Sequence, residues 1–89
     1  MERFVNYDKM KIFEMCWAKF DPKGKGFIEV SNLMELLLDL GAPMGLEKEQ
    51  ARDFKFLKEF FKELDLATFD NKMYVNYQNV CTALSKYAY

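Results

Sequence analysis

One apolar spacing occurs twice in this chain, and each time it leads to an aspartate. Phe13, Trp17 and Phe20 lie eight, four and one residues before Asp21, and a second set lies at the same distances before Asp65. The second set is Leu57, Phe61 and Leu64. Apolar residues three and four positions apart share one face of a helix. The repeat therefore predicts two similar helical units, each covering the apolar face of the other.

Each of these two apolar helix faces is followed in the sequence by signals of a loop, a short extended segment and a second helix. After Asp21, a proline and two glycines predict a turn, and residues 27–29 predict one extended rung. The second unit repeats this order with a rung at residues 74–76. The stripes of the following helices are Leu33, Leu36, Leu37 and Leu40, then Val80, Ala83, Leu84 and Tyr87. This is the order of an EF-hand, and we expect Ile28 and Val75 to pair across an antiparallel ribbon.

These signals predict an all-α fold: a paired EF-hand of four main helices with a short antiparallel ribbon between the loops. Residues 1–89 form one domain, in which unit 1 covers about residues 6–41, a linker covers 42–51 and unit 2 covers about 52–88. The expected helices start near Asn6 or Asp8 and end at Phe20, then cover 32–40, 52–64 and 77–87. Ser31 is the expected N-cap of the second helix, and Gly41 its C-terminal stop. An N-terminal arm, residues 1–7, is expected to pack back onto the body.

The first loop lacks most of the ligands that calcium needs. A calcium-binding EF-hand loop carries oxygen ligands at its first, third, fifth and twelfth positions. Here Asp21 is first, but the third and fifth residues are Lys23 and Lys25, whose ammonium groups repel a divalent ion. The twelfth is Asn32, which is too short to supply a bidentate carboxylate. Glu29 is the other carboxylate at a ligand position, and we expect no metal site here.

The second loop is no better suited to calcium. If Val75 corresponds to Ile28, this loop is three residues longer than the first. It offers Asp65 and Asp70, but its extra residues displace the ligand positions. A weak or altered calcium site stays open as an alternative, with Asp21, Glu29, Asp65 and Asp70 as its candidate ligands.

The composition argues against several classes of function. Thirteen basic and 14 acidic residues give a net charge of −1, whereas nucleic-acid-binding domains usually carry a basic excess. The chain has no histidine, and nothing in the sequence converges as an acid–base pair or an activated nucleophile. We therefore expect neither catalysis nor a cofactor.

Cys16 and Cys81 predict buried thiols in a reducing compartment rather than a disulfide. No apolar run is long enough to span a membrane, and the N-terminus predicts no signal peptide.

The chain carries more large apolar surface than a small domain buries easily, since hydrophobic residues make up 51% of it. The expected scaffold is Phe13, Trp17, Phe20, Ile28, Leu37, Leu57, Phe61 and Val75. In the third helix, Phe54 is also expected in the core, with Phe56 and Phe60 at its edge. The candidates for binding a partner are Met34, Leu38, Phe56, Phe60, Ile12 and Met15, although a place at the edge of the core stays open for them.

Five lysines lie toward the first unit, and they form either a solvated face or a contact with anionic lipid headgroups. They are Lys9, Lys11, Lys19, Lys23 and Lys25.

The first unit also resembles a known family. Residues 13–22 read F-E-M-C-W-A-K-F-D-P, and F-I-E at 27–29, Ser31, Leu33 and Pro43 follow. This pattern resembles the EF-hand-like segment after the last transmembrane helix of voltage-gated sodium and calcium channels. The F-D-P and F-I-E-x-S-x-L runs are similar to the sodium-channel version, and Lys25-Gly26-x-Ile28 and Pro43-x-Gly45 to the calcium-channel one. The resemblance covers nearly the whole chain and is strongest over residues 13–45. Residues 46–60 match neither channel type well, and this sequence contains no IQ-type calmodulin-binding helix.

The resemblance implies a non-catalytic regulatory domain of a voltage-gated cation channel, on the cytoplasmic face of the plasma membrane and without a transmembrane segment of its own. Such a domain would transmit gating or inactivation signals by helix contacts with other channel segments or a calmodulin-like protein. It would bind neither calcium nor nucleic acid. The alternative is a free-standing calmodulin- or light-chain-like EF-hand adaptor that binds a target helix. A groove that opens between helices would favour the adaptor, and a closed, rigid helix pair the channel domain.

Overall fold

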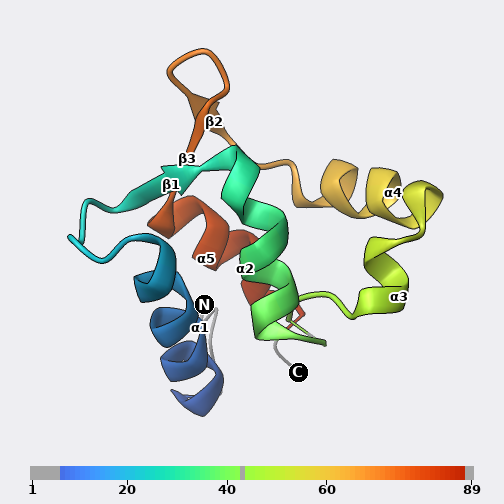
Figure 1. Cartoon of the computed structure of the whole chain (residues 1–89), viewed down its shortest axis with the longest axis horizontal. Helices are drawn as coiled ribbons and strands as arrows, with labels where there is room; N and C mark the ends of the chain where they lie inside the picture. The colour runs from blue at the N-terminus through green and yellow to red at the C-terminus, as the bar shows by residue number, and fades with distance from the viewer. Residues whose placement is uncertain (1–6, 43, 88–89) are drawn as a thin grey trace.

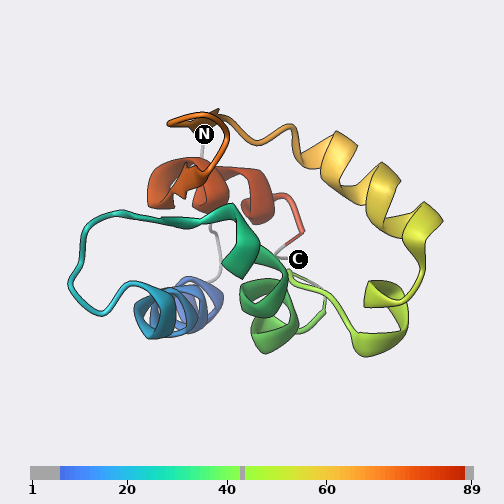
Figure 2. The same ribbon diagram turned by 45° about the horizontal axis from the view of Figure 1, so that its top comes forward.

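A computed structural model describes residues 7–42 and 44–87 of the chain. Within these residues, five α-helices accompany a small three-stranded antiparallel sheet (Figure 1). Helices α2 and α5 lie between α1 on one side and α3 and α4 on the other (Figure 1, Figure 2). The all-α prediction is therefore wrong. The fold is mixed, and a plain paired EF-hand of four helices does not describe it.

The first half of the chain follows the predicted order of elements, but the predicted N-cap of the second helix is wrong. It consists of α1 (Tyr7–Phe20), β1 (Phe27–Glu29), a 3₁₀ turn (Val30–Asn32) and α2 (Leu33–Leu40). Ser31 does not cap α2, because it lies inside the 3₁₀ turn and its hydroxyl donates to the Glu29 carboxylate at 3.1 Å. Gly41 follows α2 with a φ of 72°, which glycine adopts without strain. The predicted arm before Tyr7, including the alternative helix start at Asn6, lies outside the described residues.

The predicted third helix forms, and a separate short helix precedes it. α3 (Lys48–Ala51) falls within the expected linker, and α4 (Phe54–Leu64) follows it. The Asp53 carboxylate accepts a hydrogen bond from the Phe56 N–H at 3.1 Å, so it acts as the N-cap of α4. At the start of α3, the Glu47 N–H donates to the Gln50 side chain at 3.0 Å. Each of the two helices thus has its own start signal, and α4 begins two residues later than the expected residue 52.

The long second loop adds a strand that the sequence did not predict. The second half contains β2 (Thr68–Phe69), β3 (Tyr74–Asn76) and α5 (Tyr77–Ser85). β1 pairs with β3 in antiparallel register with Ile28 opposite Val75, which confirms the predicted pairing. β2 then pairs with the other edge of β3. The hairpin between β2 and β3 turns through Asp70, Asn71 and Lys72, which all have positive φ angles. The extra length of the second loop therefore forms a hairpin, and α5 ends at Ser85 rather than Tyr87.

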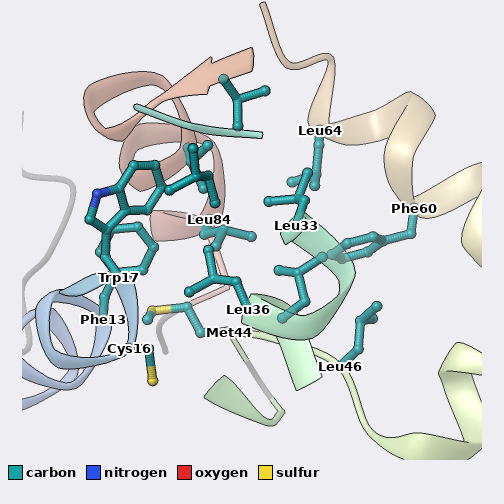
Figure 3. Packing of buried hydrophobic residues seen from close by; sticks show 14 residues of the cluster. Phe13, Cys16, Trp17, Leu33, Leu36, Met44, Leu46, Phe60, Leu64 and Leu84 are labelled. Atoms are coloured by element: carbon teal, nitrogen blue, oxygen red, sulfur yellow. The ribbon is translucent and has the colours of Figure 1, made fainter. Parts of the chain in front are cut away.

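The core lies between α1, α2 and α5 and extends to α4 (Figure 3). Its most fully buried side chains are Phe13, Leu36, Leu37, Leu46, Val75, Val80 and Leu84. From α4, Phe60 reaches toward α2, as Figure 3 shows, and only 8% of its surface is exposed. Phe60 was expected at the edge of the core, with a partner contact as the alternative, and the structure instead buries it in the core. Phe54, expected in the core, is instead 80% exposed. Phe54 is the first residue of α4, and α4 begins at its end farthest from α2 and α5 (Figure 1).

Gly45 allows the segment after α2 to fold back onto that helix. Its N–H donates to the Gly41 carbonyl at 2.7 Å, and the Leu46 N–H donates to the Leu37 carbonyl at 2.9 Å. A Cβ atom at residue 45 would collide with the Leu37 carbonyl oxygen and would lie 2.7 Å from the Cβ of Leu40. The Leu37 oxygen belongs to a helix backbone and cannot move aside cheaply.

We expect Gly45→Ala to lower the free energy of unfolding by about 1–3 kcal/mol, the usual cost of overpacking. Urea denaturation followed by circular dichroism measures this change. Ala42→Ser, at an exposed position three residues earlier, is the control and should change stability by less than about 0.5 kcal/mol. Equal stability of Gly45→Ala and the unmodified chain would show that the turn tolerates a side chain.

Candidate functional site

The first loop is organised around the carboxylate of Asp21, which has an exposure of 7%. One carboxylate oxygen accepts the Lys25 N–H at 2.8 Å. The other accepts the Gly26 N–H at 2.8 Å and the indole N–H of Trp17 at 3.1 Å. Three donors from the chain itself therefore converge on this carboxylate. Its negative charge is used to shape the loop.

The same contacts set the protonation of Asp21. Burial favours the neutral form, but the hydrogen bonds from Gly26, Lys25 and Trp17 and the nearby Lys25 charge outweigh it, so the pKa of Asp21 lies below its ordinary value. The carboxylate is therefore charged at neutral pH, and the folded loop depends on that charge.

The other first-loop residues surround a cavity of about 330 Å³ beside Asp21. Lys23 and Lys25 line it together with Glu29 and Asn32. The Glu29 carboxylate accepts the Ser31 hydroxyl at 3.1 Å. The structure thus brings the two candidate carboxylates to one cavity, and it brings the two lysines there as well. Each carboxylate already accepts a hydrogen bond from the protein.

The candidate ligands of the second loop lie on a different part of the fold. Asp65 ends α4 in a left-handed conformation with a φ of 47°, and Asp70 lies in the hairpin turn with a φ of 55°. Both side chains are exposed. In the part of the chain that the structure describes, no three cysteine, aspartate or glutamate side chains lie close enough together to hold a metal ion.

The candidate contact residues of α1 and α2 differ in exposure. Ile12 and Met15 are 49% and 67% exposed and lie three residues apart on α1. On α2, Leu38 is exposed, whereas Met34 is half-buried and lines a cavity of about 350 Å³ with Phe61 and other apolar residues. The two helices therefore carry apolar side chains outside the core.

The remaining expected residues lie in or beside the core. Phe13, Trp17, Ile28, Leu37 and Val75 are buried there, while Phe20, Leu57 and Phe61 are half-buried against it. Phe56 is also half-buried and lies at one edge of α4. Of the five lysines considered for lipid binding, Lys19 forms a salt bridge to Asp39 at 2.9 Å.

The two cysteines do not form a disulfide within the described residues. Cys16 is buried and Cys81 is half-buried. Burial, together with a hydrogen bond to Asp39 and the charge of that residue, raises the pKa of Cys16 to about 11. The Cys16 thiol is therefore protonated at neutral pH and packs as an apolar side chain.

Comparison with known proteins identifies a channel domain. Residues 12–59, from α1 to the middle of α4, match the model of the GPHH family, described as "Voltage-dependent L-type calcium channel, IQ-associated". This segment makes up more than half of the 89 residues, and the chain belongs to this family. No curated protein matches the chain. Among residues 7–42 and 44–87, none of the helices has the length and hydrophobicity needed to cross a membrane.

Asp21 predicts a specific pH dependence of stability. Because its pKa is lower in the folded protein than in the unfolded chain, its stabilising effect is present above the unfolded value of about 4. The effect is lost as the pH falls through the folded value. We expect Asp21→Asn to unfold at a lower temperature than the unmodified chain at pH 7, and the difference to shrink as the pH falls below the unfolded pKa of about 4.

The control for this experiment is Asp70→Asn, because Asp70 is exposed and asparagine tolerates its left-handed backbone. Thermal unfolding by circular dichroism at several pH values gives both curves. A difference between Asp21→Asn and the unmodified chain that does not depend on pH would contradict the role of the carboxylate charge.

Proposed function

We propose that this chain is a non-catalytic regulatory domain of a voltage-gated cation channel, which acts on gating or inactivation through protein contacts and without binding calcium itself. The family match is the observation that carries this proposal. In this proposal the domain lies at the cytoplasmic face of the plasma membrane, close to the pore. Its partners are other channel segments or a calmodulin-like protein.

The first loop supports the metal-independent part of the proposal. The Asp21 carboxylate accepts hydrogen bonds from two backbone N–H groups and the Trp17 indole. A calcium ion at this position would compete with those bonds and would lie near the ammonium groups of Lys23 and Lys25, which line the same cavity. The loop keeps its shape through its own donors, so a bound cation is not needed to hold it.

A free-standing adaptor that binds a target helix is the second candidate. The half-buried Met34 and Phe61 favour it, because they line an apolar cavity between α2 and the end of α4. The family match favours the channel domain instead. The full gene product discriminates the two: six-helix membrane repeats before Met1 would establish the channel, and their absence would favour the adaptor.

Calcium independence is tested by isothermal titration calorimetry of the 89-residue chain with millimolar Ca²⁺. We expect no binding heat above that of dilution, because the loop lysines repel the ion and its main carboxylate is engaged. A calcium-binding protein titrated in the same buffer is the positive control. A saturable signal with one ion per chain would refute this part of the proposal.

The regulatory role is tested by replacing exposed apolar side chains of α1. In the parent channel, Ile12→Gln combined with Met15→Gln should shift the voltage dependence of inactivation, because both residues are exposed on one face of α1. Met73→Gln is the matched control, since Met73 is 51% exposed and lies in the β2–β3 hairpin. Whole-cell voltage clamp measures the shift, and circular dichroism of the isolated chain checks that each variant folds. Identical inactivation curves for all three channels would count against contact through α1.

A further inference from the structure

The side chains of α4 follow a regular order around the helix axis. Phe60 and Leu64 turn to the core, and both are buried. Because each residue turns the helix by about 100°, the next positions on one side are three apolar residues, then three lysines and then two glutamates. In that order they are Phe54, Leu57 and Phe61, then Lys58, Lys62 and Lys55, then Glu59 and Glu63. The lysines therefore separate this apolar row from the glutamates.

The apolar row of Phe54, Leu57 and Phe61 lies outside the centre of the core. Leu57 and Phe61 are half-buried, whereas Phe54 is 80% exposed. Within residues 7–42 and 44–87, no other large apolar side chain is as exposed as Phe54. Helix α4 lies at the outer border of the molecule, with Phe54 at its far end (Figure 1, Figure 2). Phe54 thus projects from a convex border of the domain.

The lysine row of α4 carries charge that the chain does not neutralise. All three lysines are exposed, and among the described residues none of them forms a salt bridge, not even with the adjoining Glu59. The acidic residue next to Phe54 is Asp53, whose carboxylate accepts the Phe56 N–H at 3.1 Å and caps α4. The positive charge therefore borders the exposed apolar row directly.

This order of side chains is the chemistry of a helix that lies on an anionic membrane surface. Such a helix places its apolar residues at the boundary of the acyl chains and keeps its lysines among the headgroups beside them. Each lysine close to an anionic leaflet strengthens binding about fivefold. A protein helix, in contrast, is recognised by laying its apolar face into a groove. A bilayer accepts a projecting side chain such as Phe54 without a matching pocket.

We propose that this side of α4 binds the surface of an anionic lipid bilayer. Phe54 enters the boundary between headgroups and acyl chains, and the lysine row contacts the headgroups, while Glu59 and Glu63 stay toward water. Helix α1 lies on the opposite side of α2 and α5, so its exposed Ile12 and Met15 remain available to a channel segment (Figure 1). This inference rests on the proposed function, which puts the domain beside the plasma membrane, and it names a second surface that the domain contacts.

The test is flotation of the 89-residue chain with lipid vesicles. We expect binding to vesicles of phosphatidylcholine and phosphatidylserine in equal parts and no binding to pure phosphatidylcholine, which offers the lysines no negative charge. Phe54→Gln should lower the partition coefficient about tenfold, because it removes the inserted ring. Lys58→Gln combined with Lys62→Gln should lower it by at least about tenfold. Circular dichroism checks that each variant folds like the unmodified chain.

Two matched variants control for general stickiness and general charge. Met73→Gln removes an exposed apolar side chain from the β2–β3 hairpin, and Lys23→Gln removes an exposed charge from the first loop. Each should change the partition coefficient by less than about twofold, because charges distant from the bilayer are screened. A loss in Lys23→Gln as large as that in the α4 lysine variant would contradict a specific role of α4.

Equal binding to both kinds of vesicle, or binding to neither, would overturn the membrane contact. A glutamate-rich amphipathic peptide, followed by fluorescence anisotropy, tests the other partner that lysines attract. Binding of this peptide without binding of the anionic vesicles would assign the lysine row to an acidic protein segment instead. The inactivation of channels with altered Ile12 and Met15 tests the regulatory role separately, since that contact does not involve α4.

Discussion

The buried carboxylate of Asp21 is the interaction on which the rest of the fold depends. It accepts the Trp17 indole N–H from the last turn of α1 and the N–H groups of Lys25 and Gly26 from the loop. This fixes the direction in which the chain leaves α1. Gly26 is then held with a φ of 91°, and its carbonyl accepts the Tyr77 N–H at the start of α5 at 2.8 Å. Through Gly26, the Asp21 side chain thus connects the end of α1 to α5, which begins 56 residues after Asp21.

The sheet makes the second connection between the two halves of the chain. Ile28 and Val75 face each other in the β1–β3 pair, and both are almost fully buried. The Val30 N–H also donates to the Met73 carbonyl at 2.8 Å, which extends the contact beyond the strands. These bonds, together with the burial of Ile28 and Val75, join the two loops through the chain itself.

Patterns with a strict local cause were predictable from the sequence. The end of α1 at Asp21-Pro22, the stop at Gly41 and the pairing of Ile28 with Val75 followed from proline, glycine and the apolar spacing. The fold class was not predicted, because the β2–β3 hairpin depends on left-handed backbone at three consecutive non-glycine residues. Asp70 and Asn71 are residue types that adopt this conformation more often than most, but Lys72 is not. The side of α4 that packs on the core was also predicted wrongly. Its apolar arc is wide enough for several orientations, and the packing of Phe60 against α2 selects one.

The charges beside that arc do not select the orientation of α4 either. Lys55 lies four residues before Glu59 and Lys62 three residues after it, so residues of both signs adjoin on the exposed side of the helix. The family match ends at residue 59, whereas the buried Phe60 and Leu64 lie beyond it. Membership of the family therefore covers the first loop and the start of α4, and the packing of the rest of α4 on the core depends on residues outside the matched segment.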